Sequence, residues 1–305
     1  MPAIASTVPS VLIPYLAAGT ERMRFGAGGV MLANHAAFSV AEQFGLLSEM
    51  FPGRIDLGLG RAPGGDGLTT AILRQGLPGD GTAGYVENVE LLRELLGVGA
   101  TPVGTPVKLD VGGQRYDIHA TPASTVPTEI WLLGSSAYSA QVAANLGLPY
   151  VFANHFGIPG MEKVLRTYRD SYVPSVDFPA PQTLLPVNVV VGETEEDAQR
   201  LAGPYRLASA RLRTGARLGA QWSVEDVEDY AWTAAEQRAA TMGPPHLYVG
   251  TAQGVAEGLV SLAEQLDADE IMVVPSAGAF QEDALDRAEN RERTLSALAE
   301  ALLND

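Results

Sequence analysis

Residues 129–147 read EIWLLGSSAYSAQVAANLG. The opening run, Glu129–Leu133, is short, apolar and rich in residues that favour strands. The stretch from Ser136 to Leu146 is typical of a helix, and Gly147 is the kind of residue that ends one. A strand followed closely by a helix is the repeating unit of a parallel α/β sheet. This stretch therefore predicts one βα unit.

The same alternation continues in both directions along the chain. Further strands are predicted at Met23–Val30, Ile55–Leu59, Tyr150–Ala153, Leu184–Val191 and Glu270–Val274, with a short additional possibility at Leu247–Val249. Helices are predicted around Val40, Phe44, Leu47 and Phe51, ended by Pro52 and Gly53, around Val86, Val89, Leu92, Leu95 and Leu96, and at Leu285–Leu303. The pattern favours the α/β class, as a (β/α)8 TIM barrel. The shortfall in strands lies at the front, where residues 1–20 resemble a helix with its connections.

Two segments interrupt this rhythm within what we expect to be a single domain spanning residues 1–305. Residues 107–118 predict a hairpin excursion, because Gly112 and Gly113 suit a turn that needs positive φ. Residues 200–245 are helical and charged, and are longer than a βα connection requires. Such insertions often cover the mouth of a barrel, so this segment is a lid candidate, and a pair of surface helices is the alternative.

Composition excludes several classes of function. There is no cysteine, which rules out disulfides, zinc thiolate sites and a cysteine nucleophile. The net charge of −16 disfavours nucleic acid as a partner. No apolar run approaches the roughly 20 residues of a membrane-spanning helix. Pro9 and Pro14 interrupt the only region that could serve as a signal peptide, so we expect a cytoplasmic protein.

A second informative run, residues 54–66, reads RIDLGLGRAPGGD. A strand here leads into Arg61 and a glycine-rich loop. Barrel enzymes keep their active sites at the carboxyl ends of strands, so Arg61 is expected to face a ligand. Its forked donors suit a phosphate. The alternative is an arginine paired with Asp66 or another carboxylate.

Ser135 and Ser136 stand between the strand and the helix of the opening stretch. Unpaired N–H groups at a helix start, with the helix dipole behind them, bind phosphate, and serine hydroxyls add donors. Ordinary N-capping by either serine is the alternative. Together with Arg61 the two serines predict a single phosphate site. The run is not a P-loop, and no GxGxxG motif opens the first βα turn.

Residues 25–35, FGAGGVMLANH, place glycines near the end of another strand, where something flat could lie against the backbone. A bulge at a barrel corner explains them equally well. His35 and His155 each follow a strand end, where a barrel places reactive groups, and they are the candidate catalytic residues. No metal-binding spacing of histidines is present, so we expect no metal.

Three of these runs together resemble the bacterial luciferase-like flavin monooxygenase family, in particular its small FMN-dependent oxidoreductase branch. The runs are GGVMLANH from Gly28, GRIDLGLGRAPG from Gly53 and WLLGSSAYSA from Trp131, in the family's order. The resemblance covers nearly the whole chain and implies an FMN-dependent monooxygenase that acts on a small organic substrate. In this family reduced FMN comes from a separate NAD(P)H-dependent flavin reductase and reacts with O2. A homodimer is expected.

Carried over by position, the resemblance implies that Arg61, Ser136 and Ser139 hold the FMN phosphate, with the backbone of Ser135 beside them. Gly28 and Gly29 match the place of a non-prolyl cis peptide that lies against the flavin ring. Asn34 matches a position at the flavin edge. All of these are cofactor-binding roles.

The chain departs from the family at its beginning. Family members open with a strand, a helix and a second strand that carries paired histidines, and this sequence starts just after them. We therefore expect either a start assigned too late or a shortened protein. Two other functions stay open: a hydride transferase that uses the deazaflavin F420, and a non-catalytic, vestigial flavin-binding protein. An unrelated sugar-phosphate isomerase barrel is disfavoured, because Lys108 and Lys163 are poorly placed as its base.

Overall fold

The structure is a computed structural model that describes residues 8–64, 67–74, 81–99, 101–154, 157, 159–216, 219–241 and 247–303. The chain divides into two compact units. The first comprises residues 3–151 and 163–182, and the second comprises residues 152–162 and 183–305. Each unit is described below by itself.

The first unit is built on parallel strands. Strand β1 (Phe25–Met31) pairs with β2 (Ile55–Gly60), and β2 pairs with β5 (Glu129–Gly134). The sheet continues toward β6 (Tyr150–Phe152), where the Leu132 amide donates to the Pro149 carbonyl. Leu57, Leu59 and Ile130 are fully buried. The carboxyl ends of β2 and β5 therefore lie side by side.

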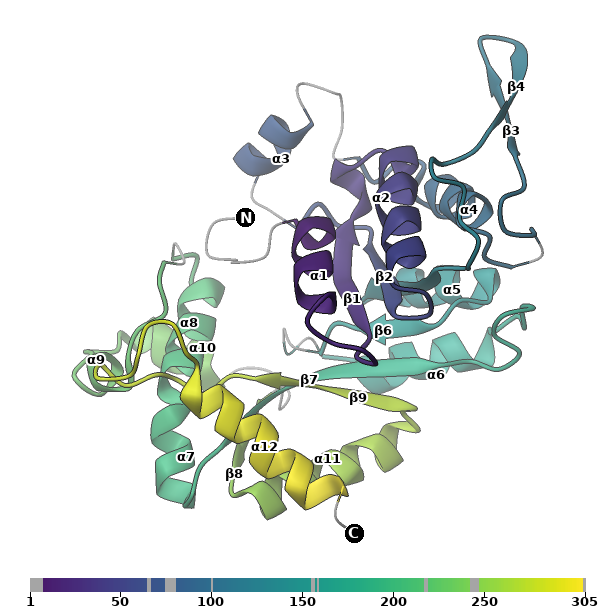
Figure 1. The fold of residues 1–305 in the computed structure, drawn as a ribbon. Helices are drawn as coiled ribbons and strands as arrows, with labels where there is room; N and C mark the ends of the chain where they lie inside the picture. The colour runs from purple at the N-terminus through teal and green to yellow at the C-terminus, as the bar shows by residue number, and fades with distance from the viewer. Residues whose placement is uncertain are drawn as a thin grey trace. The chain divides into compact units, whose positions relative to one another are not determined.

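Helices connect these strands (Figure 1). They are α1 (Pro9–Ala17), the 3-10 turn η1 (Leu32–Asn34), α2 (Ala37–Met50), α3 (Gly67–Leu73), α4 (Tyr85–Leu95), α5 (Ala137–Leu146) and most of α6 (Met161–Asp170). The apolar side chains of α2 predicted to face the sheet are buried, with Val40, Phe44 and Leu47 at most 3% exposed. Phe51 lies one residue beyond the end of this helix.

A separate two-stranded sheet also belongs to this unit. Strands β3 (Val107–Val111) and β4 (Gln114–Ile118) form an antiparallel hairpin. Gly112 and Gly113, the two turn residues, have φ values of 60° and 80°. Only glycine adopts this conformation readily at both positions of a turn. The hairpin extends away from the other elements of its unit (Figure 1).

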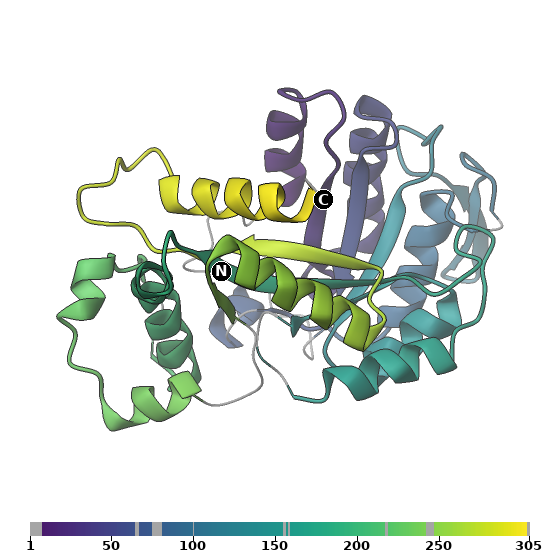
Figure 2. The same ribbon diagram turned by 90° about the horizontal axis from the view of Figure 1, so that it is seen from below.

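The second unit has β7 (Thr183–Val191) at its centre, and all nine residues of this strand are buried. Strands β8 (Leu247–Gly250) and β9 (Glu270–Pro275) both pair with it in parallel. Helices α11 (Ala252–Leu266) and α12 (Glu289–Leu303) contact one another and lie along β9 (Figure 2). The sequence of β7 is apolar except for Thr183 and Asn188, which reflects burial on both of its faces.

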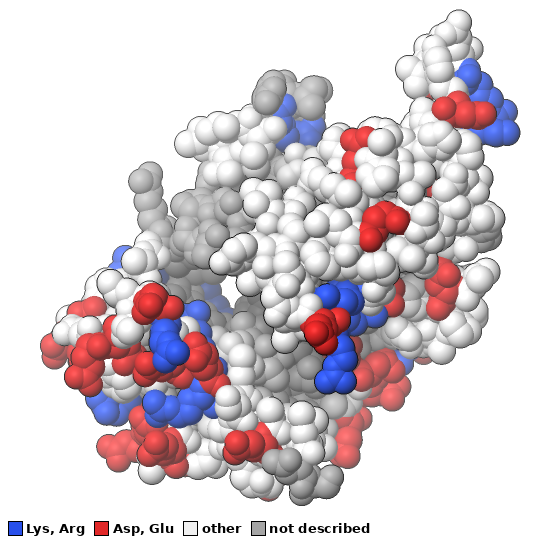
Figure 3. All heavy atoms as spheres, viewed as in Figure 1, with Lys and Arg blue, Asp and Glu red and all other residues white. Residues whose placement is uncertain are grey.

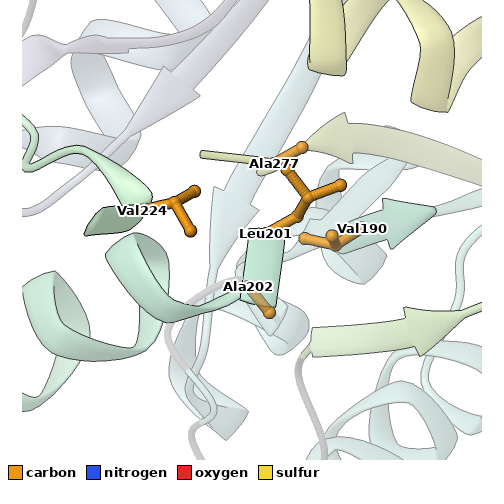
Figure 4. Packing of buried hydrophobic residues seen from close by; sticks show 5 residues of the cluster. All are labelled: Val190, Leu201, Ala202, Val224 and Ala277. Carbon is orange, nitrogen blue, oxygen red and sulfur yellow. The ribbon is translucent and has the colours of Figure 1, made fainter. Parts of the chain in front are cut away.

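The segment predicted as an insertion, residues 200–245, carries most of a helical group. The helices are α7 (Glu195–Leu201), α8 (Gly203–Arg213), α9 (Val224–Glu228) and α10 (Ala234–Thr241). A core of Val190, Leu201, Ala202, Val224 and Ala277, none more than 2% exposed, joins α7 and α9 to β7 (Figure 4). The segment is therefore anchored by buried apolar contacts to its own unit.

Every predicted parallel strand is present, including the short one at Leu247–Val249, and most bounds differ by one or two residues. The C-terminal helix is a correction, because it begins at Glu289 instead of Leu285. Leu285 is fully exposed, and the turn before the helix is held by the Asn290 side chain, which donates to the Gly278 carbonyl and the Asp283 carboxylate. Within the described ranges, the structure has no helix with the length and apolar character needed to span a membrane.

Candidate functional site

The beginning of α5 presents a group of hydrogen-bond donors. Ser136 is the N-cap, and its hydroxyl accepts from the Ser139 amide at 3.3 Å. The Ser139 hydroxyl in turn accepts from the Ser136 amide at 3.3 Å and donates to the Ser136 carbonyl at 2.8 Å. Ala137 and Tyr138 follow as the first helical residues, whose N–H groups have no acceptor inside a helix. Capping and ligand binding are therefore compatible here, because the cap fixes the direction of the remaining donors.

Gly134 makes this arrangement possible. A Cβ atom at this position would lie 2.2 Å from Ser139 Oγ and 2.5 Å from Ser139 Cβ. No side chain can be accommodated at such distances without a shift of the helix start. The glycine between strand and helix is therefore required by the close approach of Ser139 to the end of β5.

Arg61 follows the last residue of β2, next to the end of β5 in the sheet. Its guanidinium carbon lies 4.5 Å from the centre of the Tyr138 ring, and both side chains are exposed. Within the described part of the chain, no carboxylate forms an ion pair with Arg61. Asp66, the partner considered from the sequence, lies outside the described residues. The structure thus brings the cation and the helix start together through the Tyr138 ring.

Two buried tyrosines belong to the same cluster and were not predicted from the sequence. The Tyr150 hydroxyl lies 3.0 Å from Ser139 Oγ, and burial raises the pKa of Tyr150 to about 12, with the Ser139 hydrogen bond acting in the opposite direction. The Tyr85 hydroxyl donates to the Leu59 carbonyl at 3.3 Å. Burial raises the Tyr85 pKa well above its usual range, and the Arg61 charge opposes this rise. Both tyrosines stay neutral donors at physiological pH.

In the local sequence, the two tyrosines are marked only by their places at the start of a strand and of a helix. Tyr150 is the first residue of β6, and Tyr85 is the first residue of α4. Neither position marks a site until the sheet order is known.

The glycine-rich strand β1 packs its backbone closely against β2. A Cβ at Gly29 would lie 2.6 Å from the Gly58 carbonyl oxygen, and one at Gly58 would lie 2.2 Å from the Ala27 carbonyl oxygen. Gly28 differs, because nothing lies within 4 Å of where its Cβ would be. The Gly28–Gly29 peptide is cis, as the family resemblance implies, and the β1–β2 register shifts at this point. The strand therefore has both features considered from the sequence: an irregularity between Gly28 and Val30, and an open backbone surface at Gly28.

Asn34 ends η1, and its side-chain amide donates to the Pro63 carbonyl at 2.8 Å. This bond ties η1 to the loop that follows Arg61. The other amide atom, Oδ1, is buried and accepts no hydrogen bond from the described protein. A buried acceptor without a donor is unusual and needs an explanation, of which a bound ligand is one.

The two candidate histidines differ in what can be said of them. His35 is exposed by area, yet the protein atoms around its ring lower its pKa below the usual value through partial desolvation. His155 lies outside the described residues. Its neighbour Asn154, in the second unit, is 1% exposed, and neither polar atom of its side-chain amide has a partner within the described chain.

These features describe an α/β protein whose parallel strands end in a cluster of donors and an uncompensated cation. The luciferase-like monooxygenase family matches residues 4–269, and this chain belongs to that family. A relative named luciferase-like monooxygenase, from Escherichia coli strain K12, is 37% identical over 273 residues, which covers 90% of this chain and 77% of the relative.

Two further comparisons also match members of known monooxygenase groups or a related fold, as follows. The N-acetyl-S-alkylcysteine monooxygenase of Bacillus subtilis strain 168 is 34% identical over 265 residues, covering 85% of this chain and 74% of that one. The crystal structure of apo-MsnO8 matches with a TM-score of 0.78 and 31% identity, covering 97% of this chain and 82% of that one. The fold class of this chain is therefore the luciferase-like TIM barrel.

Proposed function

We propose that this protein is a flavin-dependent monooxygenase that uses reduced FMN and O2 to oxygenate a small organic substrate. The observation that carries the proposal is the meeting of Arg61 with the start of α5 at the ends of neighbouring strands. A terminal phosphate carries negative charge and several acceptor oxygens, so it needs a cation and converging donors together. The described residues supply both.

The donors fit a phosphate in number and in kind. The guanidinium of Arg61 can donate two parallel hydrogen bonds to phosphate oxygens. The amides of Ser135, Ala137 and Tyr138 and the Ser136 hydroxyl would supply neutral donors at the positive end of the α5 dipole. The Ser139 hydroxyl would join them by turning its hydrogen from the Ser136 carbonyl to the phosphate. The Tyr150 hydroxyl holds Ser139 in place from the next strand.

The remaining flavin contacts are assigned to β1 and η1. The open surface at Gly28, beside Gly29, would accept the flat ring, because no side chain intervenes there. The buried Oδ1 of Asn34 would accept a hydrogen bond from the edge of the ring. When bound in reduced form, the flavin supplies the electrons that activate O2. His35 and His155 are proposed to act on protons at the reacting end of the site.

The supply of electrons is assigned to a separate NAD(P)H-dependent flavin reductase. This chain has no GxGxxG motif after its first strands that would bind a dinucleotide.

We also propose that the protein acts in the cytoplasm as a homodimer, and that residues 200–245 act as a lid on the site.

A comparison of FMN with riboflavin tests the proposed phosphate site directly, because the two flavins differ only in the phosphate. Flavin fluorescence quenching should show FMN binding about 10 to 100 times more tightly than riboflavin, the value of one or two charge-assisted hydrogen bonds. Equal affinity for the two flavins would contradict the phosphate assignment.

The reaction is tested separately. Addition of a flavin reductase, NADPH and FMN should give O2 consumption that increases with a substrate and with this protein. A parallel titration with F420 distinguishes the hydride transferase, which would bind the deazaflavin more tightly than FMN. FMN binding without any oxygenated product would favour the vestigial binding protein.

A further inference from the structure

The segment that carries Arg61 has little packing of its own. No residue from Arg61 to Gly64 is buried. In α3, which comes next along the chain, Leu68 and Ile72 are 72% and 65% exposed. This helix contains no charged residue, and its described surface is white in Figure 3. The position of Arg61 therefore depends on contacts that the segment makes with other elements of its unit.

The connection between β1 and α2 supplies three such contacts. The Asn34 side chain donates to the Pro63 carbonyl, close to Arg61. The Ala33 carbonyl accepts from Arg74 Nη1 at 2.7 Å, next to the last residue of α3. The third contact is made by Met31, the last residue of β1. The segment is thus held both at its beginning and beyond its helix.

Met31 packs beside Arg61 on both sides of it along the chain. In the parallel register of β1 and β2, Met31 is the partner of Gly60. A Cβ atom at Gly60 would lie 3.1 Å from Met31 Sδ, and one at Gly64 would lie 2.9 Å from Met31 Cγ and 3.0 Å from Sδ. The thioether therefore fills the space beside two glycines that flank Arg61. An unbranched, flexible side chain suits an irregular space of this kind.

This contact differs from ordinary packing of the core. Met31 is only partly buried, whereas the preceding residue, Val30, is 7% exposed. Successive residues of a strand point to opposite faces, so Val30 and Met31 pack against different surroundings. Loss of the Met31 side chain should therefore affect the segment that carries Arg61 more than it affects the fold.

We infer that Met31 is a positioning residue that directs Arg61 toward the start of α5. The inference rests on the proposed phosphate site, in which Met31 touches no phosphate oxygen and acts through the backbone at Gly60 and Gly64. The Arg61 guanidinium carbon lies 4.5 Å from the centre of the Tyr138 ring, on the first turn of α5. Hydrogen bonds from a guanidinium to a phosphate require a narrow range of distance and angle. A segment freed from the thioether would satisfy that range less often.

The ratio of FMN affinity to riboflavin affinity of the full chain measures this role, because only FMN carries the phosphate. Met31→Ala should lower the ratio about threefold to tenfold and leave riboflavin affinity unchanged. Met31→Leu nearly conserves the volume and should keep the ratio within about twofold of the wild-type value. Val30→Ala is the matched control from the same strand. It should lower Tm and keep the ratio, as a purely structural role of Met31 would also do.

Gly60→Ala tests the contact from the neighbouring strand. Its new Cβ would meet Met31 Sδ at 3.1 Å, and its next neighbours are Met31 Cε at 3.8 Å and the Val30 carbonyl oxygen at 4.0 Å. The substitution should displace the thioether and lower the ratio about threefold. In a Met31→Ala background it should have no further effect, because the new methyl group enters the space that the thioether has left. Additive effects of the two substitutions would overturn the inference.

Arg61→Gln separates this inference from the proposed function. If Arg61→Gln leaves the ratio unchanged, the phosphate site itself is wrong. If Arg61→Gln lowers the ratio and Met31→Ala does not, only the role of Met31 is wrong. The double variant of Met31→Ala with Arg61→Gln should have the ratio of Arg61→Gln alone, and a further fall would contradict an action through Arg61.

Circular dichroism of each variant checks that the fold is retained. If Met31→Ala does not fold, Gly60→Ala decides alone, and an unchanged ratio in that variant refutes the role of Met31.

Discussion

The two ends of strands β2 and β5 differ in how the charge of an arginine is compensated. At the amino ends, Asp56 and Glu129 are direct partners in the register, and Arg24 pairs with both, with its Nη2 atom 2.8 Å from Glu129 Oε2. Hydrogen bonds to the two carboxylates raise the pKa of Arg24 above its already high value. At the carboxyl ends, Arg61 forms no ion pair with a described carboxylate.

We propose that this difference separates residues that stabilise the fold from residues that bind a ligand. A cation between two carboxylates has its charge compensated within the protein. A cation beside a helix start has partial positive charge next to it, which is favourable only when an anion binds. Barrel enzymes place their active sites at the carboxyl ends of the strands, and the distribution of compensated and uncompensated charge follows the same division. The predictions below test this contrast.

The largest effect is expected from Gly134→Ala at the carboxyl end. The new Cβ would displace Ser139, disrupt the capping box and separate Ser139 from Tyr150. We expect a loss of roughly 1–3 kcal/mol in the free energy of unfolding and FMN binding weakened by up to about 100-fold, the whole contribution of the phosphate. Thermal denaturation and flavin titration measure the two. Gly19→Ala is the control, because its Cβ would meet only the Leu16 carbonyl oxygen, at 3.5 Å.

The next largest effects are expected from replacing one arginine at each end of strands β2 and β5. Arg61→Gln should weaken FMN binding about tenfold or more with no change in Tm, and the preference for FMN over riboflavin should fall by the same factor. Arg24→Gln should lower Tm by about 2 °C, as expected for partly exposed ion pairs, and should leave FMN affinity unchanged. The contrast between the two ends fails if Arg24→Gln affects FMN binding as strongly as Arg61→Gln does.

A smaller effect is expected from removing single tyrosine hydroxyls. Tyr150→Phe removes the hydroxyl that contacts Ser139 and should weaken FMN binding about threefold to tenfold. The control is Tyr168→Phe, which removes hydrogen bonds to the Leu148 carbonyl and from the Gln182 amide. That variant should lower Tm and retain FMN affinity. A Tyr150→Phe variant with unchanged affinity would show that Ser139 needs no support from β6.

The smallest effect concerns pH. Desolvation lowers the pKa of His35 below 6.5, so the unfolded chain binds its proton more readily than the folded chain does. Stability should therefore fall as pH decreases through 6.5 toward the lower folded-state pKa, and should be constant above that window. Between pH 7.5 and 5 the Tm of wild type should fall by about 1–2 °C relative to that of His35→Gln. No change at all would show that the ring is fully hydrated in the folded state.

Much of this architecture could be predicted from the sequence. The strands were predictable because short runs of apolar, β-favouring residues are typical of strands buried in a sheet. Leu184–Val191, in which only Asn188 is polar, is one example. The turn at Gly112 and Gly113 followed from local backbone sterics. The C-terminal helix was placed too early, because the exposed Leu285 imitates the apolar periodicity of the helix that follows it.

The sequence by itself determined which residues form strands and helices, because these depend on interactions between residues close together in the chain. It also identified Arg61 and the serines near Ser136 as donors with a common chemistry. Only the tertiary structure decided that these donors meet, that Arg61 has no described carboxylate partner, and that Tyr85 and Tyr150 join them. The physical reason is that sheet order and close approach, as at Gly134, bring together side chains far apart in the sequence, and no local pattern records such distances.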